Sequence, residues 1–294
     1  MSEPQSQAAD QVAEFRSKGP LAQEIAATSY LLDLGTGLSW CVSGSERVQP
    51  ILEKLAGIFR MQPGYRDTWP HLLLGSDPAG FRKCDAYRDF PAEGWTAMPV
   101  GGSRIWSHPT VPDVCCDAPC YDNPNGFFLA WTSMVHAIYR KVIENGGVPI
   151  HGALIERGGV GVALAGASGR GKSTCCCRLA DPWRVLSDDT TLVMPARSEG
   201  FCARPFPTWG DMLRHDGTIL PDVRHAAPLV RLFFLEQTAS DEVRPLGKGE
   251  AAAKIYASAS QIFGSNLAIM ERAESGVARV RLFDNACRLS SAVK

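Results

Sequence analysis

Apolar residues recur at two spacings along this chain, and the spacings predict both strands and helices. Short apolar runs rich in β-branched residues predict strands at 30–34, 39–42, 71–74, 148–156, 158–165, 183–186, 191–194, 229–235 and 277–283. Apolar residues three or four positions apart predict helices at 48–59, 127–145, 172–179 and 251–263. Residues 77–125 are rich in Pro, Gly, Asp and Trp and predict short strands only.

This order of elements predicts an α/β protein of two domains. We place the boundary near residue 125, with a smaller N-terminal α+β module over 1–125 and an α/β nucleotide core over 126–294. Residues 1–27 are polar and alanine-rich, which predicts a tail or a frayed helix before the first strand.

Composition and charge narrow the class of protein. The chain has 294 residues, of which 45% are hydrophobic, and a formal net charge of -1, which is typical of a soluble globular protein. Near-neutral charge gives no support for a nucleic-acid partner, and no apolar run is long enough to predict a membrane span. The polar start lacks a signal-peptide core, so we expect a cytoplasmic protein whose ten cysteines are reduced.

A glycine-rich segment matches the phosphate-binding pattern G-x-x-x-x-G-K-[ST] between a predicted strand and a predicted helix. Its residues are Gly166, Ala167, Ser168, Gly169, Arg170, Gly171, Lys172, Ser173 and Thr174. Glycines let backbone N–H groups converge on an anion, and the helix that follows adds partial positive charge. We therefore predict that this segment binds nucleotide phosphates, with Lys172 on the β- and γ-phosphates and the Ser173 hydroxyl on Mg²⁺.

Two further signals point to phosphoryl transfer. Asp188 and Asp189 follow an apolar strand, so one carboxylate can hold Mg²⁺ while the other accepts a proton from an incoming hydroxyl. His151 lies in the strand pair that delivers the glycine-rich segment, where it could approach the γ-phosphate. From spacing alone, a structural role for this histidine is equally compatible with the sequence.

The segments around His151, Gly158, Gly166 and Asp188 occur in an order that resembles the kinase domain of HPr kinase/phosphorylase. The resemblance implies an HPr kinase / phosphoenolpyruvate carboxykinase-like fold that uses ATP and Mg²⁺. It also implies that Asp188 is the base for a substrate serine and that Asp189 and Ser173 bind the metal. Lys172 would then bind the phosphates, and His151 would lie near the transferred phosphate.

Downstream, residues 203–210 depart from the corresponding HPr kinase segment. Residues 204–209, 228–229 and 232–237 are similar instead to HPr-kinase-related proteins found beside peptide-modification genes, such as the kinase-like protein of the SynChlorMet cassette. This resemblance implies transfer of the γ-phosphate to a Ser or Thr hydroxyl of a peptide or small protein in ribosomal-peptide modification.

Two alternatives stay open at this stage. A small-molecule kinase of the same fold would need a narrower acceptor pocket. A nucleotide-gated binding or scaffold module would bind ATP and a partner without transferring phosphate. The sequence does not name the acceptor or the oligomeric state, nor does it choose among ATP, GTP and pyrophosphate.

Several cysteines and arginines are weaker candidates. A metal site could combine Cys115, Cys116 and Cys120 with Cys84 or Cys202, but the spacing is not that of a standard zinc site. Residues 175–177 are three cysteines on the predicted helix after the glycine-rich segment, where packing is the simpler role. Arg204 and Arg214 could contact substrate or phosphate, or could be solvated or salt-bridged.

Overall fold

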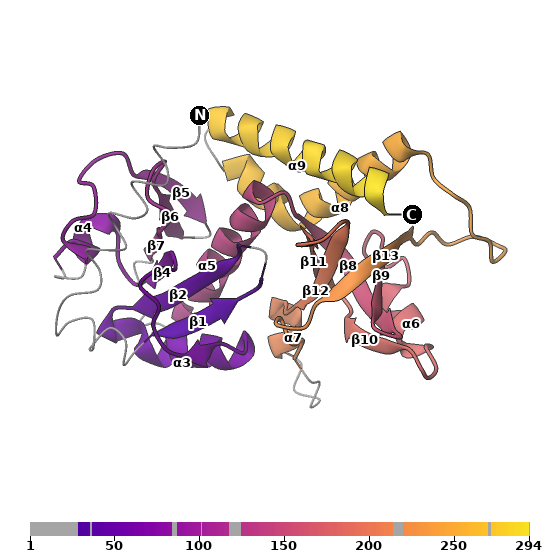
Figure 1. The fold of residues 1–294 in the computed structure, drawn as a ribbon, viewed down its shortest axis with the longest axis horizontal. Helices are drawn as coiled ribbons and strands as arrows, with labels where there is room; N and C mark the ends of the chain where they lie inside the picture. Colours follow the sequence, from indigo (N-terminus) through magenta and orange to yellow (C-terminus); the bar gives the residue numbers. More distant parts are fainter. Residues whose placement is uncertain are drawn as a thin grey trace. The chain divides into compact units, whose positions relative to one another are not determined.

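The chain forms a mixed α/β structure that divides into two compact units (Figure 1). The computed structural model describes residues 29–35, 37–83, 87–100, 102–117, 125–213, 220–269 and 272–293. One unit contains residues 1–33 and 39–138, and the other contains residues 34–38 and 139–294. The predicted boundary near residue 125 lies at the start of helix α5 (Gly126–Glu144), which runs from the first unit into the second. The predicted N-terminal tail lies outside the described residues.

The first unit is built on a seven-stranded mixed sheet with strand order β3-β1-β2-β4-β7-β6-β5. Its elements are β1 (Tyr30–Asp33), β2 (Ser39–Gly44), the 3-10 helix η1 (Glu46–Val48), α3 (Gln49–Ile58), β3 (Gln62–Pro63), β4 (His71–Leu74), α4 (Pro78–Phe81), β5 (Thr96–Val100), β6 (Ser103–Ser107) and β7 (Val114–Asp117). The three strands and the helix predicted before residue 75 are confirmed.

Burial explains why β4 lies inside this sheet. All four of its residues are buried, and the strand pairs in parallel with β2 on one side and β7 on the other. A strand that is covered on both faces reads as a continuous apolar run, as Leu72, Leu73 and Leu74 do. Leu73 packs into a cluster with Phe81, Tyr87, Phe90 and Cys115, and Trp95 and Trp106 pack against the same cluster.

The second unit is built on a six-stranded sheet that closes on itself. Its elements are β8 (Val148–Arg157), β9 (Val160–Ala165), α6 (Lys172–Cys177), β10 (Arg184–Ser187), β11 (Thr190–Pro195), β12 (Phe201–Phe206), α7 (Trp209–Leu213), β13 (Ala227–Phe234), α8 (Lys248–Ile269) and α9 (Arg272–Ala292). The strand order is β10-β8-β11-β12-β13-β9, and an additional β8–β9 pairing closes a barrel-like ring. In this ring β9 and β13 are parallel, and the other pairs are antiparallel.

Strand β8 brings the predicted site segments together. Residues 148–151 pair with β11, residues 154–156 pair with β10, and residues 152–157 pair with β9 along the other edge. Because β10 and β11 follow one another and share an edge of β8, the two residues between them lie opposite the middle of β8. The β9 strand on the other edge leads directly into the glycine-rich segment.

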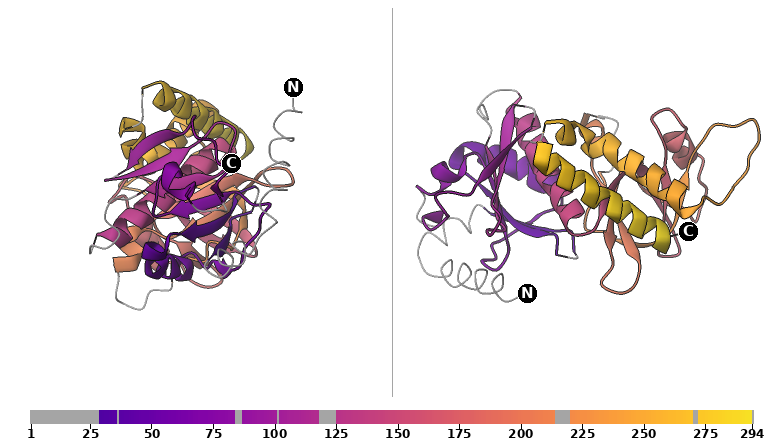
Figure 2. Two further views of the ribbon diagram at one scale, coloured as in Figure 1. Left: turned by 90° about the vertical axis from the view of Figure 1, so that its left-hand side faces the viewer. Right: turned by 90° about the horizontal axis from the view of Figure 1, so that it is seen from above.

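Helices α8 and α9 lie side by side, and α8 packs against β8 (Figures 1 and 2). The predicted strand at 277–283 is wrong, because these residues belong to α9. Leu282, Ala286 and Leu289 are buried at helical spacing, whereas Val277 and Val280 are more than 60% exposed. Packing of one helical face on α8 therefore outweighed the strand preference of the valines.

The amide of Asn285 in α9 stabilises the end of α5. Its Nδ2 donates to the carbonyl oxygens of Ile143, at 2.8 Å, and Gly147, at 2.9 Å, and the side chain is fully buried. The last carbonyl groups of a helix lack partners within the helix, so a buried side-chain donor satisfies them.

Among the described helices, none combines the length and apolar character needed to cross a membrane.

A buried carboxylate joins three segments at the far end of β8. Glu156 accepts a short hydrogen bond from the Arg184 guanidinium, and its Oε1 lies 3.0 Å from Nε2 of His225. The Glu156 side chain is 9% exposed, whereas the Arg184 side chain is 65% exposed. The hydrogen bond from Arg184 is the main reason why the pKa of Glu156 lies below its usual value.

We expect Glu156→Gln to lower the free energy of unfolding by about 1.5–3 kcal/mol at neutral pH, the usual contribution of a hydrogen bond to a charged group. A depressed folded-state pKa gives stability that is present above the unfolded-state pKa and is lost as pH falls through the folded value. The difference between wild type and variant should therefore shrink in acid. Urea unfolding from pH 7 to pH 3 measures it, with the exposed Glu250→Gln as control. A constant difference across that range would contradict the assignment.

Candidate functional site

The glycine loop, residues 166–171, joins β9 to α6. Gly169 and Gly171 have φ of 77° and 99°, a region that favours glycine. A Cβ atom at either position would meet no atom within 4 Å, so the requirement for glycine is conformational and the space beside the loop is open. The loop turns through a hydrogen bond from the Arg170 N–H to the Ala167 carbonyl and leads directly into α6.

Lys172, the first residue of α6, folds back onto this loop. Its Nζ donates to the carbonyl oxygens of Gly166, at 2.8 Å, and Ala167, at 3.3 Å, and to Nε2 of His151, at 2.8 Å. The residue is 7% exposed, and burial lowers the pKa of the ammonium group, opposed by the charges of Asp189 and Asp188. The Lys172 ammonium group therefore lies at the mouth of the loop and donates only to uncharged acceptors in these three contacts. An incoming anion can replace those acceptors.

His151 on β8 links this lysine to the paired carboxylates. Because an ammonium group only donates, Nε2 of His151 accepts from Lys172, and Nδ1 carries the ring hydrogen of the neutral tautomer. That Nδ1 lies 3.4 Å from Oδ1 of Asp189. Burial and the charge of Lys172 lower the pKa of His151, and Asp189 acts in the opposite direction. The imidazole therefore connects Asp189 to Lys172 as a neutral group.

Asp188 and Asp189 lie where the chain passes from β10 to β11. The Asp189 carbonyl accepts from the Gly152 N–H at 2.8 Å, and the Gly152 carbonyl accepts from the Thr191 hydroxyl at 2.8 Å. A bulge in β10 between Val185 and Ser187 precedes the pair. These contacts fix both half-buried aspartates next to the centre of β8, and both act electrostatically on Lys172.

The structure therefore brings together most of the residues that the sequence singled out. Lys172 contacts His151, His151 contacts Asp189, and Asp188 is the neighbouring residue in the chain. Ser168, Ser173 and Thr174 are exposed along the loop and the first turn of α6. Among the described residues, no group of three or more His, Cys, Asp or Glu side chains is arranged to hold a metal. The roles of Ser173 and Asp189 toward Mg²⁺ remain predictions.

The weaker candidates have structural environments. Burial raises the pKa of the Cys115 and Cys116 thiols, and as neighbours on β7 they point to opposite faces of the sheet. Cys176 packs against β8 and β9, and burial raises its pKa to about 11. Arg204 donates to the carbonyls of Val223 and Arg224, at 3.3 and 2.7 Å. Three other candidates lie outside the described residues: Cys84, Cys120 and Arg214.

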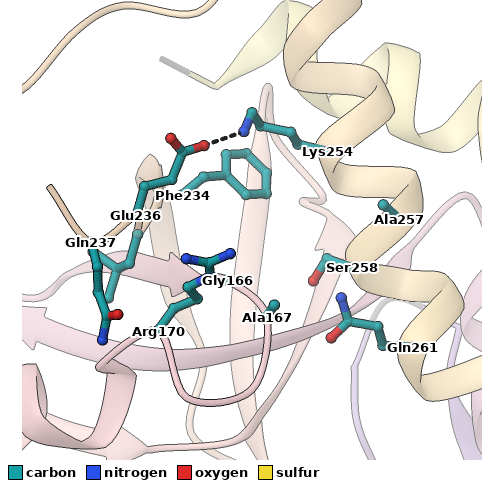
Figure 3. A pocket seen from close by; sticks show the side chains of 11 residues that line it. Gly166, Ala167, Arg170, Phe234, Glu236, Gln237, Lys254, Ala257, Ser258 and Gln261 are labelled. Carbon is teal, nitrogen blue, oxygen red and sulfur yellow. Dashed lines mark hydrogen bonds and ion pairs between the residues drawn. The ribbon is translucent and has the colours of Figure 1, made fainter.

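Sequence reasoning missed a pocket of about 420 Å³ beside the glycine loop, which we call the loop pocket (Figure 3). It lies between the loop, the end of β13 and α8. Its lining residues are Gly166, Ala167, Arg170, Phe234, Leu235, Glu236, Gln237, Lys254, Ala257, Ser258 and Gln261. The available signal was the polar pair Glu236 and Gln237 directly after a predicted strand, although nothing in the sequence indicated that α8 would face it.

Comparison with protein families identifies the family of this chain. The model of the family described as SynChlorMet cassette protein ScmC matches residues 114–294, which is more than half of the sequence, so the chain belongs to that family. The match includes the whole glycine loop, His151 and both aspartates. A comparison with curated proteins gives no match.

Proposed function

We propose that this member of the ScmC family is a Mg²⁺- and ATP-dependent kinase with an HPr kinase-like core. Its acceptor would be a Ser or Thr hydroxyl of a peptide or small protein. The observation that carries the proposal is the contact chain from Asp189 through His151 to Lys172 at the mouth of the glycine loop. A phosphate-binding loop alone fits any nucleotide-binding protein, whereas carboxylates connected to its lysine fit transfer of the phosphate.

The core supports this proposal through its strand arrangement. Strand β9, which precedes the glycine loop, lies between an antiparallel neighbour, β8, and a parallel one, β13. In the common doubly wound nucleotide-binding folds the sheet is mostly parallel. The mixed, ring-closed sheet around this loop differs from that arrangement, which argues against a doubly wound nucleotide-binding fold.

In the proposed mechanism Lys172 exchanges its loop carbonyls for phosphate oxygens. The ammonium group would then stabilise charge on the β- and γ-phosphates, while neutral His151 orients it and Asp189 fixes the imidazole. Backbone N–H groups of the glycine loop would bind the same phosphates. The arrangement suits an anion because these residues present one buried cation beside an open, glycine-lined space.

Asp188 would act as the general base. It would take the proton of the acceptor hydroxyl as that oxygen bonds to the γ-phosphorus, and the bond to the β,γ-bridging oxygen would break to release ADP. Ser173 and Asp189 would hold Mg²⁺, which supplies positive charge to the phosphates when bound. An oxygen donor set of hydroxyl and carboxylate suits this cation.

The family description names a cassette protein, and we therefore propose that the acceptor is a peptide encoded in the same cassette. We expect the protein with Mg²⁺ and ATP to add one phosphate to a Ser or Thr of a short peptide encoded in the same cassette. Intact-mass spectrometry followed by fragmentation measures the product and its site. The same peptide with its Ser and Thr residues changed to Ala serves as control.

Other outcomes of this experiment would favour the small-molecule kinase or the nucleotide-gated scaffold. Phosphate on a small molecule, with every cassette peptide unmodified, would indicate a small-molecule kinase. Tight binding of ATP and a partner without any phosphate transfer would indicate a nucleotide-gated scaffold and would overturn the kinase proposal.

A further inference from the structure

We infer that the loop pocket binds the nucleoside part of the phosphate donor, the base with its ribose. The inference rests on the proposed function, because it takes the glycine loop as the site of the donor's phosphates. It goes further by assigning the nucleoside of that donor to named residues outside the glycine loop. Pockets of roughly 300–1,000 Å³ hold small molecules and cofactors, and the loop pocket, at about 420 Å³, lies in this range.

The position of the pocket indicates that it binds the nucleoside end of the donor and not the reacting phosphate end. It is lined by the loop at Gly166, Ala167 and Arg170, but the described residues that line it include neither aspartate. An acceptor hydroxyl has to reach the proposed base, Asp188, which does not line the pocket. The one carboxylate among the described lining residues, Glu236, is ion-paired with Lys254. The non-reacting end of the donor has no such requirement and needs only to adjoin the loop.

The order of the strands supports the same orientation of the donor. Asp188 and Asp189 lie beside β8, on one side of β9, whereas Phe234 and Glu236 come from the end of β13, on its other side. A chain of phosphates in the glycine loop at the end of β9 can therefore present its last phosphate toward the aspartates. The opposite end of that chain then lies toward β13 and the loop pocket.

The lining has the mixed chemistry that a base with its ribose requires. Phe234 is half-buried and contributes an aromatic ring, and Lys254 lies 5.9 Å from the ring centroid. Ser258 and Gln261 project from α8 into the pocket (Figure 3) and add both hydrogen-bond donors and hydrogen-bond acceptors. A nucleobase has apolar faces and polar edges, so one aromatic wall and one polar wall fit it.

Two contacts attach the walls of the pocket to each other and to the loop. Glu236 accepts from Nζ of Lys254 at 2.6 Å, which joins the end of β13 to α8 across the rim (Figure 3). Gln237 Nε2 donates to the Gly169 carbonyl at 3.2 Å. Because the same segment contacts both the pocket and the loop, the pocket is held at a fixed place relative to the phosphate site.

The test fills the pocket without touching the loop. Ala257 is exposed on α8 and lines the pocket, so Ala257→Phe adds a ring inside it. Ala253 is exposed one turn earlier on the same helix and does not line the pocket, so Ala253→Phe is the matched control. Calorimetry in the presence of Mg²⁺ measures the affinity of each protein for two ligands. These are an ATP analogue with an imido β,γ-bridge and inorganic tripolyphosphate.

Wild type should bind the analogue more tightly than tripolyphosphate. Ala257→Phe should weaken the analogue roughly tenfold or more, toward the tripolyphosphate value, because the nucleoside contacts are lost and the phosphate contacts remain. Tripolyphosphate binding should be unchanged in both variants, and Ala253→Phe should change neither ligand.

Three results would overturn the inference while leaving phosphate binding by the loop intact. They are equal affinity of wild type for both ligands, unchanged analogue binding in Ala257→Phe, and equal weakening of both ligands. If Ala257→Phe instead abolishes peptide phosphorylation with analogue binding unchanged, the pocket belongs to the acceptor. Failure of wild type to bind either ligand would reject the proposed function itself, and the nucleoside assignment with it.

Discussion

Lys172→Ala should abolish most of the affinity of this protein for nucleotide. Three of the contacts made by Nζ are to uncharged acceptors, so the ammonium group is available to bind phosphate oxygens once an anion enters the glycine loop. Removing one partner of a buried, hydrogen-bonded charge pair costs about 2–5 kcal/mol, which corresponds to roughly 30- to 4,000-fold in the dissociation constant. Transfer of phosphate should fall at least as far.

Calorimetric titration with Mg²⁺ and ATP measures this loss. Lys248→Ala is a suitable control, because it removes a lysine that is exposed at the start of α8 and touches none of the site residues described above. Thermal unfolding of both variants tests whether the fold is retained. Burial disfavours the charge of Lys172 in the nucleotide-free protein, so we expect its removal to leave the fold intact. Wild-type ATP affinity in Lys172→Ala would exclude the glycine loop as the phosphate site.

Local signals in the sequence were sufficient for the glycine loop and for most strands. The loop depends on glycines at fixed spacing between an apolar strand and a short helix, so neighbouring residues determine its shape. The strands β8 and β9 were predictable for a similar reason, because they are continuous apolar runs that the sheet buries. Phosphate binding by Lys172 was therefore predictable from neighbouring residues, whereas the choice of Asp188 as the base rested on the resemblance to HPr kinase.

The contacts of His151 could not be predicted in this way. Its role depends on the shared edge of β8, where β11 pairs with residues 148–151 and β10 pairs with residues 154–156. That pairing brings Asp189 to Nδ1, while the return of α6 over the loop brings Lys172 to Nε2. Pairing between distant strands leaves no local pattern, so spacing alone could not separate a site histidine from a structural one.

The C-terminal helices show a second limit of prediction from sequence. The valines of α9 favour a strand by propensity, and its buried residues are few and widely spaced. Only packing on α8 determines that the segment is helical, and propensity is a weak guide where tertiary contacts decide. The loop pocket was missed for the same reason, since its polar wall comes from α8, many residues after the glycine loop.

Asp188→Asn should separate catalysis from nucleotide binding. The substitution keeps the size of the side chain but removes the proton acceptor and one negative charge. General-base catalysis contributes roughly 10²–10⁴-fold in rate, so we expect phosphate transfer to fall by that factor. ATP affinity should be retained or slightly increased, because one charge that repels phosphate is removed. Single-turnover transfer to the cassette peptide and calorimetry with ATP measure the two quantities separately.

Asp189→Asn is the matched comparison, because it removes the same charge from the adjacent residue. If Asp189 holds the metal, this variant should need more Mg²⁺ to reach its full rate, whereas Asp188→Asn should stay slow at any Mg²⁺ concentration. The charge of Asp189 raises the pKa of His151, so Asp189→Asn should lower that pKa further, as NMR titration of the imidazole would detect without any substrate. Transfer at the wild-type rate by Asp188→Asn would show that Asp188 is not the base, and an unchanged His151 titration in Asp189→Asn would contradict the contact between the two side chains.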